Sequence, residues 1–250
     1  MSIKGTLEFD EIINEKAQTP DIFLFSESID SIYNESFIEE ELKIMSFEHA
    51  VKEGELERKC FIDSIKRYQK NTGLVDSVQT GICKIKGITV AIAVMEPQFI
   101  RGSMGVVVGE KISNLIVYAD RYNLPLLTFS GSGGARVQEG IYALLQMSKI
   151  CLHLRDCRIK NSRFLHISFI ATPTTGGVLA SFTMLGDIIL SEPDVYVGFA
   201  GKELIEEIIK VEVDPYIQSS ENFYDKGLVD LILPRIYQRE VIHSILLLHS

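Results

Sequence analysis

Apolar and polar residues alternate along most of the chain in blocks that predict strands and helices in turn. Blocks at 78–85 and 89–95 predict two strands, joined by a tight turn at Lys86-Gly87. Further apolar runs predict strands at 124–129, 164–170, 188–190 and 196–199. Helical spacing predicts helices at about 60–72, 107–121, 135–154, 178–185, 202–209 and 237–249. This alternation favours an α/β layered domain, with its site on loops at the strand C-termini.

Residues 1–58 break this pattern. They are rich in Glu, Asp and Ser, and their apolar periodicity is weak. Acidic clusters such as Glu39-Glu40-Glu41 leave such a segment little apolar surface to bury. We therefore predict an acidic N-terminal arm over 1–58, solvated or partly disordered, followed by one ordered domain over 59–250.

Two glycine pairs follow predicted strands and precede predicted helices. Gly133-Gly134 comes after the run at 124–129, and Gly176-Gly177 comes after the next predicted strand. A single glycine pair usually has only a structural role in a turn, because glycine allows positive φ and close packing of helix on sheet. Two equivalent corners, with Gly102-x-x-Gly105 before a third helix, instead favour backbone N–H donors that hold a negatively charged oxygen.

Composition and the remaining motifs argue against several other functions. The net charge of −9 is against general nucleic-acid binding through a basic surface. No apolar run approaches the ~20 residues that span a bilayer, and the N-terminus resembles neither a signal nor a transit peptide. The four cysteines form no C-x-x-C pair, so we expect reduced thiols. No metal-binding, P-loop or Ser-His pattern is present, which leaves the glycine corners as the candidate site.

Several stretches at and around the corners carry a resemblance to a known family. They lie at 68–74, 78–82, 102–105, 108–112, 132–140, 173–178, 184–189, 199–202 and 225–230. Together they resemble the carboxyltransferase β subunit of multi-subunit acetyl-CoA carboxylase, particularly its plastid-encoded form. The resemblance runs from about Phe61 to the C-terminus.

This resemblance implies a crotonase-type α/β fold, with a β-β-α spiral core and flanking helices. It implies carboxyl transfer from carboxybiotin, on a separate biotin carboxyl carrier protein, to acetyl-CoA, which gives malonyl-CoA for fatty acid synthesis. The implied partners are a carboxyltransferase α subunit, in an α2β2 assembly, and the biotin carboxylase of the full complex, where ATP is bound. No covalently bound cofactor, nucleic-acid partner or integral membrane segment is expected.

By the same resemblance, the corner glycines Gly133, Gly134, Gly176 and Gly177 hold the thioester enolate, with Gly134 and Gly177 as the expected donors.

The expected acyl-CoA contacts are Gly102, Ser103, Met104, Gly105, Arg136 and Lys202. Two of them have structural alternatives. Arg136 can instead pair with Glu139 or order its loop, and Met104 can instead belong to the core.

The chain departs from the family at several points. Bacterial and many plastid members carry an N-terminal zinc ribbon of two C-x-x-C pairs, whereas no cysteine precedes Cys60, so we predict no zinc. Arg101 stands where the family usually has glycine, and Glu203 stands where it has arginine. The family also has an aromatic residue near Pro97.

These departures leave two alternatives open. One is a divergent subunit, non-catalytic or weakly active. The other is a stand-alone acyl-CoA hydratase or hydrolase that uses Glu110 or Glu139. The plastid-like motifs, the lack of a transit peptide and the richness in Ile, Asn and Lys favour the chloroplast stroma, with a bacterial cytoplasm as the alternative.

Overall fold

The computed structural model describes residues 11–12 and 51–249, apart from the side chains of 11–12, 51–59, 172 and 202–204. Most of the predicted acidic arm, residues 1–10 and 13–50, lies outside the described residues. The chain divides into two units, Asn14–Asp76 and Met1–Ile13 with Ser77–Ser250, and each is described by itself.

In the first unit, helix α3 spans Val51–Thr72. It begins before the expected start near residue 60 and runs through the predicted domain boundary at residue 58. It ends where the sequence predicts. Gly73 has a φ of 69° and donates its N–H to the Gln69 carbonyl at 2.8 Å, which closes the last turn.

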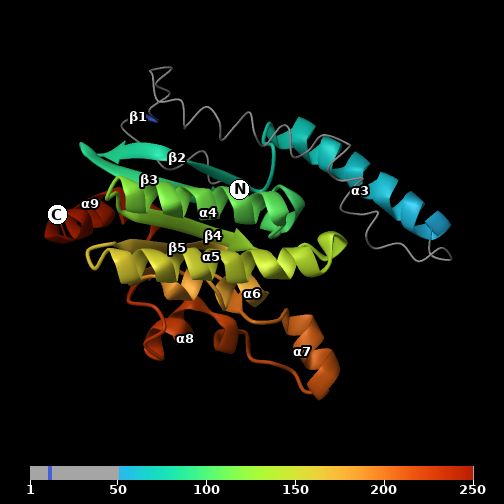
Figure 1. Ribbon diagram of the computed structural model, residues 1–250. Coiled ribbons are helices and arrows are strands. Elements are labelled where there is room, and N and C mark those ends of the chain that lie inside the picture. The colour runs from blue at the N-terminus through green and yellow to red at the C-terminus, as the bar shows by residue number, and fades with distance from the viewer. Residues whose placement is uncertain (1–10, 13–50, 250) are drawn as a thin grey trace. The chain divides into compact units, whose positions relative to one another are not determined.

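The second unit is built on one mixed β-sheet (Figure 1). Within the described residues the sheet has eight strands in the order β1-β2-β3-β4-β5-β6-β8, with β7 paired to β5. β1, β2 and β3 pair antiparallel, and the later pairs are parallel. The predicted antiparallel pair is confirmed, with Val78 opposite Met95. The strands are β1 Glu11–Ile12, β2 Val78–Ile85, β3 Ile88–Met95, β4 Leu126–Ser132, β5 His166–Thr175, β6 Ile188–Ser191, β7 Val197–Gly198 and β8 Leu231–Ile232.

Helices pack on both faces of the sheet. α4 (Val106–Arg121) and α5 (Ile141–Lys160) lie side by side over one face (Figure 1). Ala91 and Ala93 of β3 belong to the core under these helices. The alternate residues Val90 and Ile92 join the core under α9 (Gln238–His249), because side chains alternate along a strand.

The remaining helical segments are short. They are α6 Gly176–Leu179, α7 Lys202–Ile209 and α8 Ser220–Asp225, with 3-10 turns at Ile100–Gly102, Val137–Glu139, Thr183–Leu185, Pro215–Gln218 and Arg235–Tyr237. Within the part of the chain that the structure describes, no helix is long and apolar enough to cross a membrane.

The predicted helix over 135–154 is wrong at its start, because α5 begins only at Ile141. Ala135 instead forms a β-bridge with Met104. Gly140, with a φ of 57°, interrupts the backbone directly before the helix. Val137, which lies inside the predicted helix, is 85% exposed and belongs to the 3-10 turn Val137–Glu139. The apolar periodicity therefore included loop residues.

Two other predictions need adjustment near the corners. β4 continues to Ser132 and β5 to Thr175, so both strands reach their glycine pairs. The helix predicted over 178–185 is two segments, α6 and the 3-10 turn at Thr183–Leu185. The other predicted strands, with α4, α7 and α9, lie close to their predicted bounds.

Candidate functional site

The two glycine corners lie directly beside each other. β4 and β5 are parallel neighbours, and Ser132 pairs with Thr174 where both strands end. Gly134 has a φ of 104° and Gly176 a φ of 64°, in the region that favours glycine. A Cβ placed on Gly176 would lie 3.6 Å from the Cα of Gly134. The sheet thus brings together two corners that are far apart in sequence.

At the first corner, both glycine amides already have acceptors. The Gly133 N–H donates to the Arg101 carbonyl at 2.9 Å. The Gly134 N–H donates to the Oγ of Ser132 at 3.1 Å, a contact between residues two apart in sequence. The Gly133 amide is therefore committed to the backbone of the preceding loop.

The next amide along, that of Ala135, has no acceptor among the described residues. The β-bridge to Met104 explains why. The Met104 N–H donates to the Gly134 carbonyl at 2.9 Å, and the Arg136 N–H donates to the Met104 carbonyl at 2.8 Å. Since successive N–H groups of an extended chain point to opposite sides, the Ala135 N–H points away from Met104.

At the second corner, Gly176 and Gly177 begin α6, so their N–H groups have no acceptor inside the helix. The parallel register of β5 and β7, with Thr175 opposite Gly198, directs the Gly176 N–H to the Gly198 carbonyl. The Gly177 N–H has no acceptor among the described residues. Met147 of α5 packs against this corner, because a Cβ on Gly177 would lie 2.6 Å from its Sδ. The hydroxyl of Thr175 donates to the Ser132 carbonyl at 3.4 Å and links the two corners.

Two amides, those of Ala135 and Gly177, are therefore available as donors within the described residues. These amides would stabilise a negatively charged oxygen through hydrogen bonds and not through a helix dipole. α6 has only four residues, and α5 begins too far along the chain for its dipole to act at Gly133-Gly134. The donor role expected for Gly134 and Gly177 stays a prediction. Ala135 was missed, because its availability depends on a distant bridge that no local pattern encodes.

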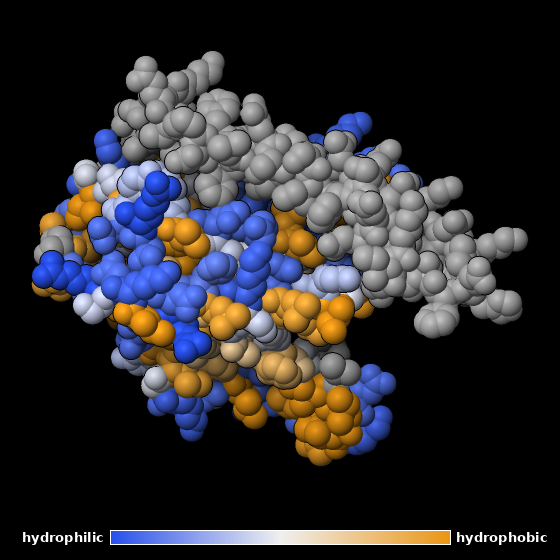
Figure 2. Space-filling view, in the orientation of Figure 1, coloured by the Kyte–Doolittle hydropathy of each residue, from blue (hydrophilic) through white to orange (hydrophobic). Residues whose placement is uncertain are grey.

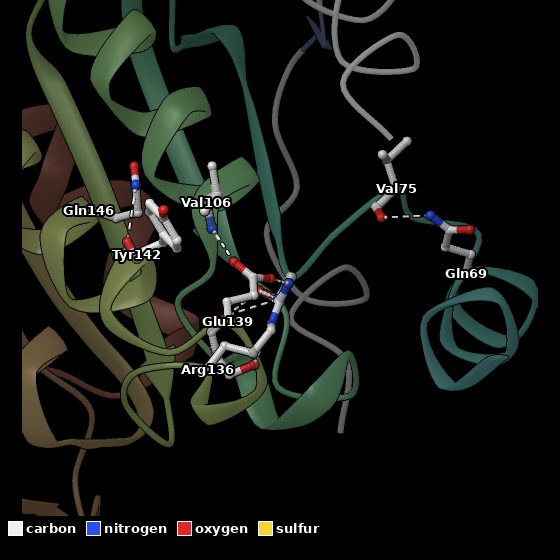
Figure 3. Close-up of polar contacts among 9 residues, drawn as sticks. Gln69, Val75, Val106, Arg136, Glu139, Tyr142 and Gln146 are labelled. Carbon is white, nitrogen blue, oxygen red and sulfur yellow. Dashed lines mark hydrogen bonds and ion pairs between the residues drawn. The ribbon is translucent and has the colours of Figure 1, made fainter. Parts of the chain in front are cut away.

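Arg136, an expected contact of coenzyme A, is 1% exposed. Its Nη1 pairs with Glu139 Oε1 at 2.8 Å, and Glu139 Oε2 accepts the Val106 N–H at 2.6 Å (Figure 3). Its Nε and Nη2 donate to the hydroxyl and the carbonyl of Ser103, each at 3.0 Å. The guanidinium thus fastens the loop before α4 to the loop before α5. This is the structural alternative raised by the sequence, and it leaves no exposed surface for a phosphate.

The other expected acyl-CoA contacts shape the same loop. Met104 is fully buried in the core under α4 and α5, which agrees with its structural alternative. A Cβ on Gly102 would lie 2.0 Å from the Gly131 carbonyl oxygen, and one on Gly105 would meet the Arg136 side chain at 2.6 Å. At both positions the neighbouring atoms leave no room for a side chain, so close packing requires glycine. Lys202 is the first residue of α7, and its side chain lies outside what the structure describes.

His166 is buried in β5, and its Nε2 lies 2.9 Å from the Oγ1 of Thr128. Burial, with a smaller effect of the nearby Arg158 charge, lowers the pKa of His166 to about 4. The imidazole is therefore a neutral core group at pH 7. His166 is the first residue of β5, whereas the glycine corner follows the last, so it is not placed to act as a base at the corners.

We expect acid to destabilise the fold through His166. The unfolded chain takes up a proton at an ordinary pKa of 6.5, whereas the folded chain resists protonation down to a pKa of about 4. Stability is therefore complete above pH 6.5 and falls as the pH drops, by about 2 kcal/mol at pH 5. Urea unfolding at pH 7 and pH 5 should show this loss in the wild type and not in His166→Asn. An equal loss in both proteins would contradict the assignment.

Among the described residues, no group of His, Cys, Asp and Glu side chains is arranged to hold a metal ion. The four cysteines are free thiols. Burial raises the pKa of the Cys83 thiol to about 12, so this thiol is unreactive at neutral pH.

Comparison with known proteins matches residues 42–223 to the carboxyl transferase domain family. The chain is 52% identical over 188 residues to the chloroplastic acetyl-coenzyme A carboxylase carboxyl transferase subunit beta of Fagopyrum esculentum subsp. ancestrale. It is 48% identical over 194 residues to the protein of the same name from Solanum lycopersicum. These matches cover 75% and 78% of this chain but 40% and 39% of the relatives, so the chain spans about two fifths of their length.

The fold is similar to that of a solved transcarboxylase 12S with methylmalonyl-coenzyme A bound. The TM-score is 0.62 and the sequence identity 26%, over 69% of this chain and 33% of that one. Together with the family match, this confirms the predicted α/β crotonase-like fold.

Proposed function

Since the chain belongs to the carboxyl transferase family, we propose that it is the acyl-CoA-binding β subunit of an acetyl-CoA carboxylase. In this role it transfers a carboxyl group from carboxybiotin, carried on a separate protein, to acetyl-CoA and forms malonyl-CoA for fatty acid synthesis. The observation that carries this proposal is the meeting of two glycine corners with an unused amide at each, those of Ala135 and Gly177, among the described residues.

The part of this chain in the reaction is to bind the acyl thioester and to stabilise its enolate. Loss of a proton from the acetyl methyl group moves negative charge onto the thioester oxygen. The amides of Ala135 and Gly177 would donate hydrogen bonds to that oxygen, where fixed donors are most effective. The carboxyl group would leave the ureido nitrogen of carboxybiotin and form a bond to the methyl carbon, and the ureido group freed in this way would take up the methyl proton. Glu139, beside the first corner, is held by Arg136, so the base is proposed to come from the biotin side.

A stand-alone hydratase or hydrolase is less well supported. It would need a free carboxylate over the acyl group. Glu110 pairs with Lys149, and Glu139 pairs with Arg136. Both candidate carboxylates are thus engaged in ion pairs, which favours carboxyl transfer over water addition.

The proposed partner is a carboxyltransferase α subunit that brings the biotin-facing half of the site, in an α2β2 assembly. Hydrophobic side chains gather at the surface over α5 and over α7 (Figure 2). Exposed apolar surface of this kind marks contact sites for other proteins. The exposed residues are Ile141, Leu144, Leu145, Leu152 and Ile159 on α5 and Ile208 and Ile209 on α7.

The wider setting belongs to the same proposal. Biotin reaches the site on its carboxyl carrier protein, and biotin carboxylase recharges it in the full complex. No zinc is proposed for this chain. The relatives are chloroplastic by name, which supports the chloroplast stroma as the location.

Carboxyl transfer is expected only when this chain is combined with its α partner. The assay is malonyl-CoA-dependent carboxylation of free biotin, measured with each subunit alone and with the mixture. Activity confined to the mixture is the expected result. Turnover of an enoyl-CoA by this chain alone would instead favour a hydratase, and a stable complex without transfer would favour a non-catalytic subunit.

A further inference from the structure

Arg101 lies beside the first glycine corner. It belongs to the 3-10 turn Ile100–Gly102, which follows β3. Its carbonyl accepts the Gly133 N–H at 2.9 Å, and a Cβ placed on Gly133 would lie 3.5 Å from the Cβ of Arg101. The Arg101 side chain therefore starts at the corner that carries the free Ala135 amide.

The backbone at this point is held in an unfavourable conformation. Ile100 has a φ of 44° and Arg101 a φ of 56°, values that L-residues seldom adopt. Such residues persist only where the surroundings fix them, and they cluster at binding sites. The surroundings here are tight, since Gly102 packs against the Gly131 carbonyl. Glycine would adopt the same φ without strain, so the arginine side chain is retained at a cost in stability.

The positive charge of Arg101 is available to bind a ligand. Its side chain is exposed, and its guanidinium has no hydrogen bond or ion pair among the described residues. Arg136, the other arginine of these loops, is buried and paired with Glu139. Arg101 is thus a positive charge beside the corner that carries the free Ala135 amide, in a chain whose net charge is −9.

We propose that Arg101 binds the carboxylate that the reaction adds to the acyl group, and this inference rests on the proposed function. Carboxyl transfer converts a neutral acetyl group into one that ends in a carboxylate. A guanidinium offers two parallel N–H donors that match a carboxylate. The phosphates of coenzyme A have similar chemistry, but they lie at the far end of the pantetheine arm from the thioester. Arg101, placed beside the thioester site, is suited to the nearer anion.

The test is the affinity of the assembled complex for malonyl-CoA and for acetyl-CoA, measured by equilibrium binding. In Arg101→Gly the backbone keeps its φ without strain and loses only the side chain. Malonyl-CoA binding should weaken by about tenfold or more, as expected for loss of a hydrogen bond to a charged group. Acetyl-CoA binding should change by less than about twofold, because no carboxylate is lost. Arg101→Lys, which keeps the charge without the paired donors, should fall between Arg101→Gly and the wild type.

Equal weakening of both thioesters would overturn the proposal and indicate a phosphate contact. Unchanged binding of both would also overturn it and leave Arg101 a surface residue. These outcomes are separate from failure of the proposed function. A wild-type complex that binds both thioesters but transfers no carboxyl group would reject carboxyl transfer, while the comparison of affinities would still be readable.

Discussion

Gly134→Ala is expected to lower carboxyl transfer by about 100-fold or more, the effect of losing one oxyanion donor. Gly134 has a φ of 104°, which alanine cannot hold without strain. Relaxation of that strain would rotate the peptide between Gly134 and Ala135 and turn the Ala135 N–H away from the thioester oxygen. The added methyl group has room, since its nearest neighbour is the Thr175 carbonyl oxygen at 3.8 Å. The fold should therefore persist while the donor is misplaced.

Gly87→Ala is the matched control. Gly87 has a φ of 89° in the turn between β2 and β3, and a Cβ there would meet nothing within 4 Å. Both substitutions therefore introduce similar backbone strain, of about 1–3 kcal/mol, but only one lies at the corners. Transfer rates are to be compared in the complex, alongside urea midpoints for both variants. If Gly134→Ala were as active as Gly87→Ala, the corner would have no part in catalysis.

Arg136→Ala is expected to destabilise the protein by about 3 kcal/mol, in the range for breaking a buried ion pair. The substitution removes the partner of Glu139 and leaves the Ser103 carbonyl without its donor. It also opens a cavity at a side chain that is 1% exposed. Urea unfolding of the isolated chain measures this loss directly.

Lys149→Ala is the control for charge alone. Lys149 pairs with Glu110, and both side chains are about one third exposed (38% and 33%). Its loss should cost less than about 1 kcal/mol, because water already solvates the pair. The loss of unfolding free energy in Arg136→Lys should fall between the losses in Arg136→Ala and Lys149→Ala. Lysine keeps the charge but cannot make the separate contacts to Ser103 and Glu139. Equal stability of Arg136→Ala and Lys149→Ala would show that Arg136 does not fasten the two loops.

Much of the fold could be predicted because local patterns determine it. The strand Ile88–Met95 is apolar on both faces, and the structure buries it between α4 and α5 on one side and α9 on the other. Gly73 and the Lys86-Gly87 turn mark where a helix ends and a strand reverses. The two corners could be anticipated for a similar reason, since neighbouring β-α units of a parallel sheet place their loops at one edge.

What the sequence could not reveal depends on contacts between distant residues. The free amide of Ala135 results from a bridge to Met104, and the start of α5 shifts because that bridge occupies Ala135. Arg136 was expected at a ligand, because charged side chains are seldom fully buried. Its contacts with Ser77 and Ser103, distant in sequence, make the buried position tolerable.

The thioester oxygen itself can report whether it binds at the two corners. Infrared difference spectra of acetyl-CoA labelled with ¹³C at the thioester carbonyl can be recorded on the α/β complex. We expect the carbonyl stretch to move to lower frequency in the wild type and in Gly87→Ala, because donated N–H groups polarise the C=O bond. In Gly134→Ala that shift should largely disappear. An unshifted carbonyl in the wild type, or the same shift in all three proteins, would contradict an oxyanion site at the two glycine corners.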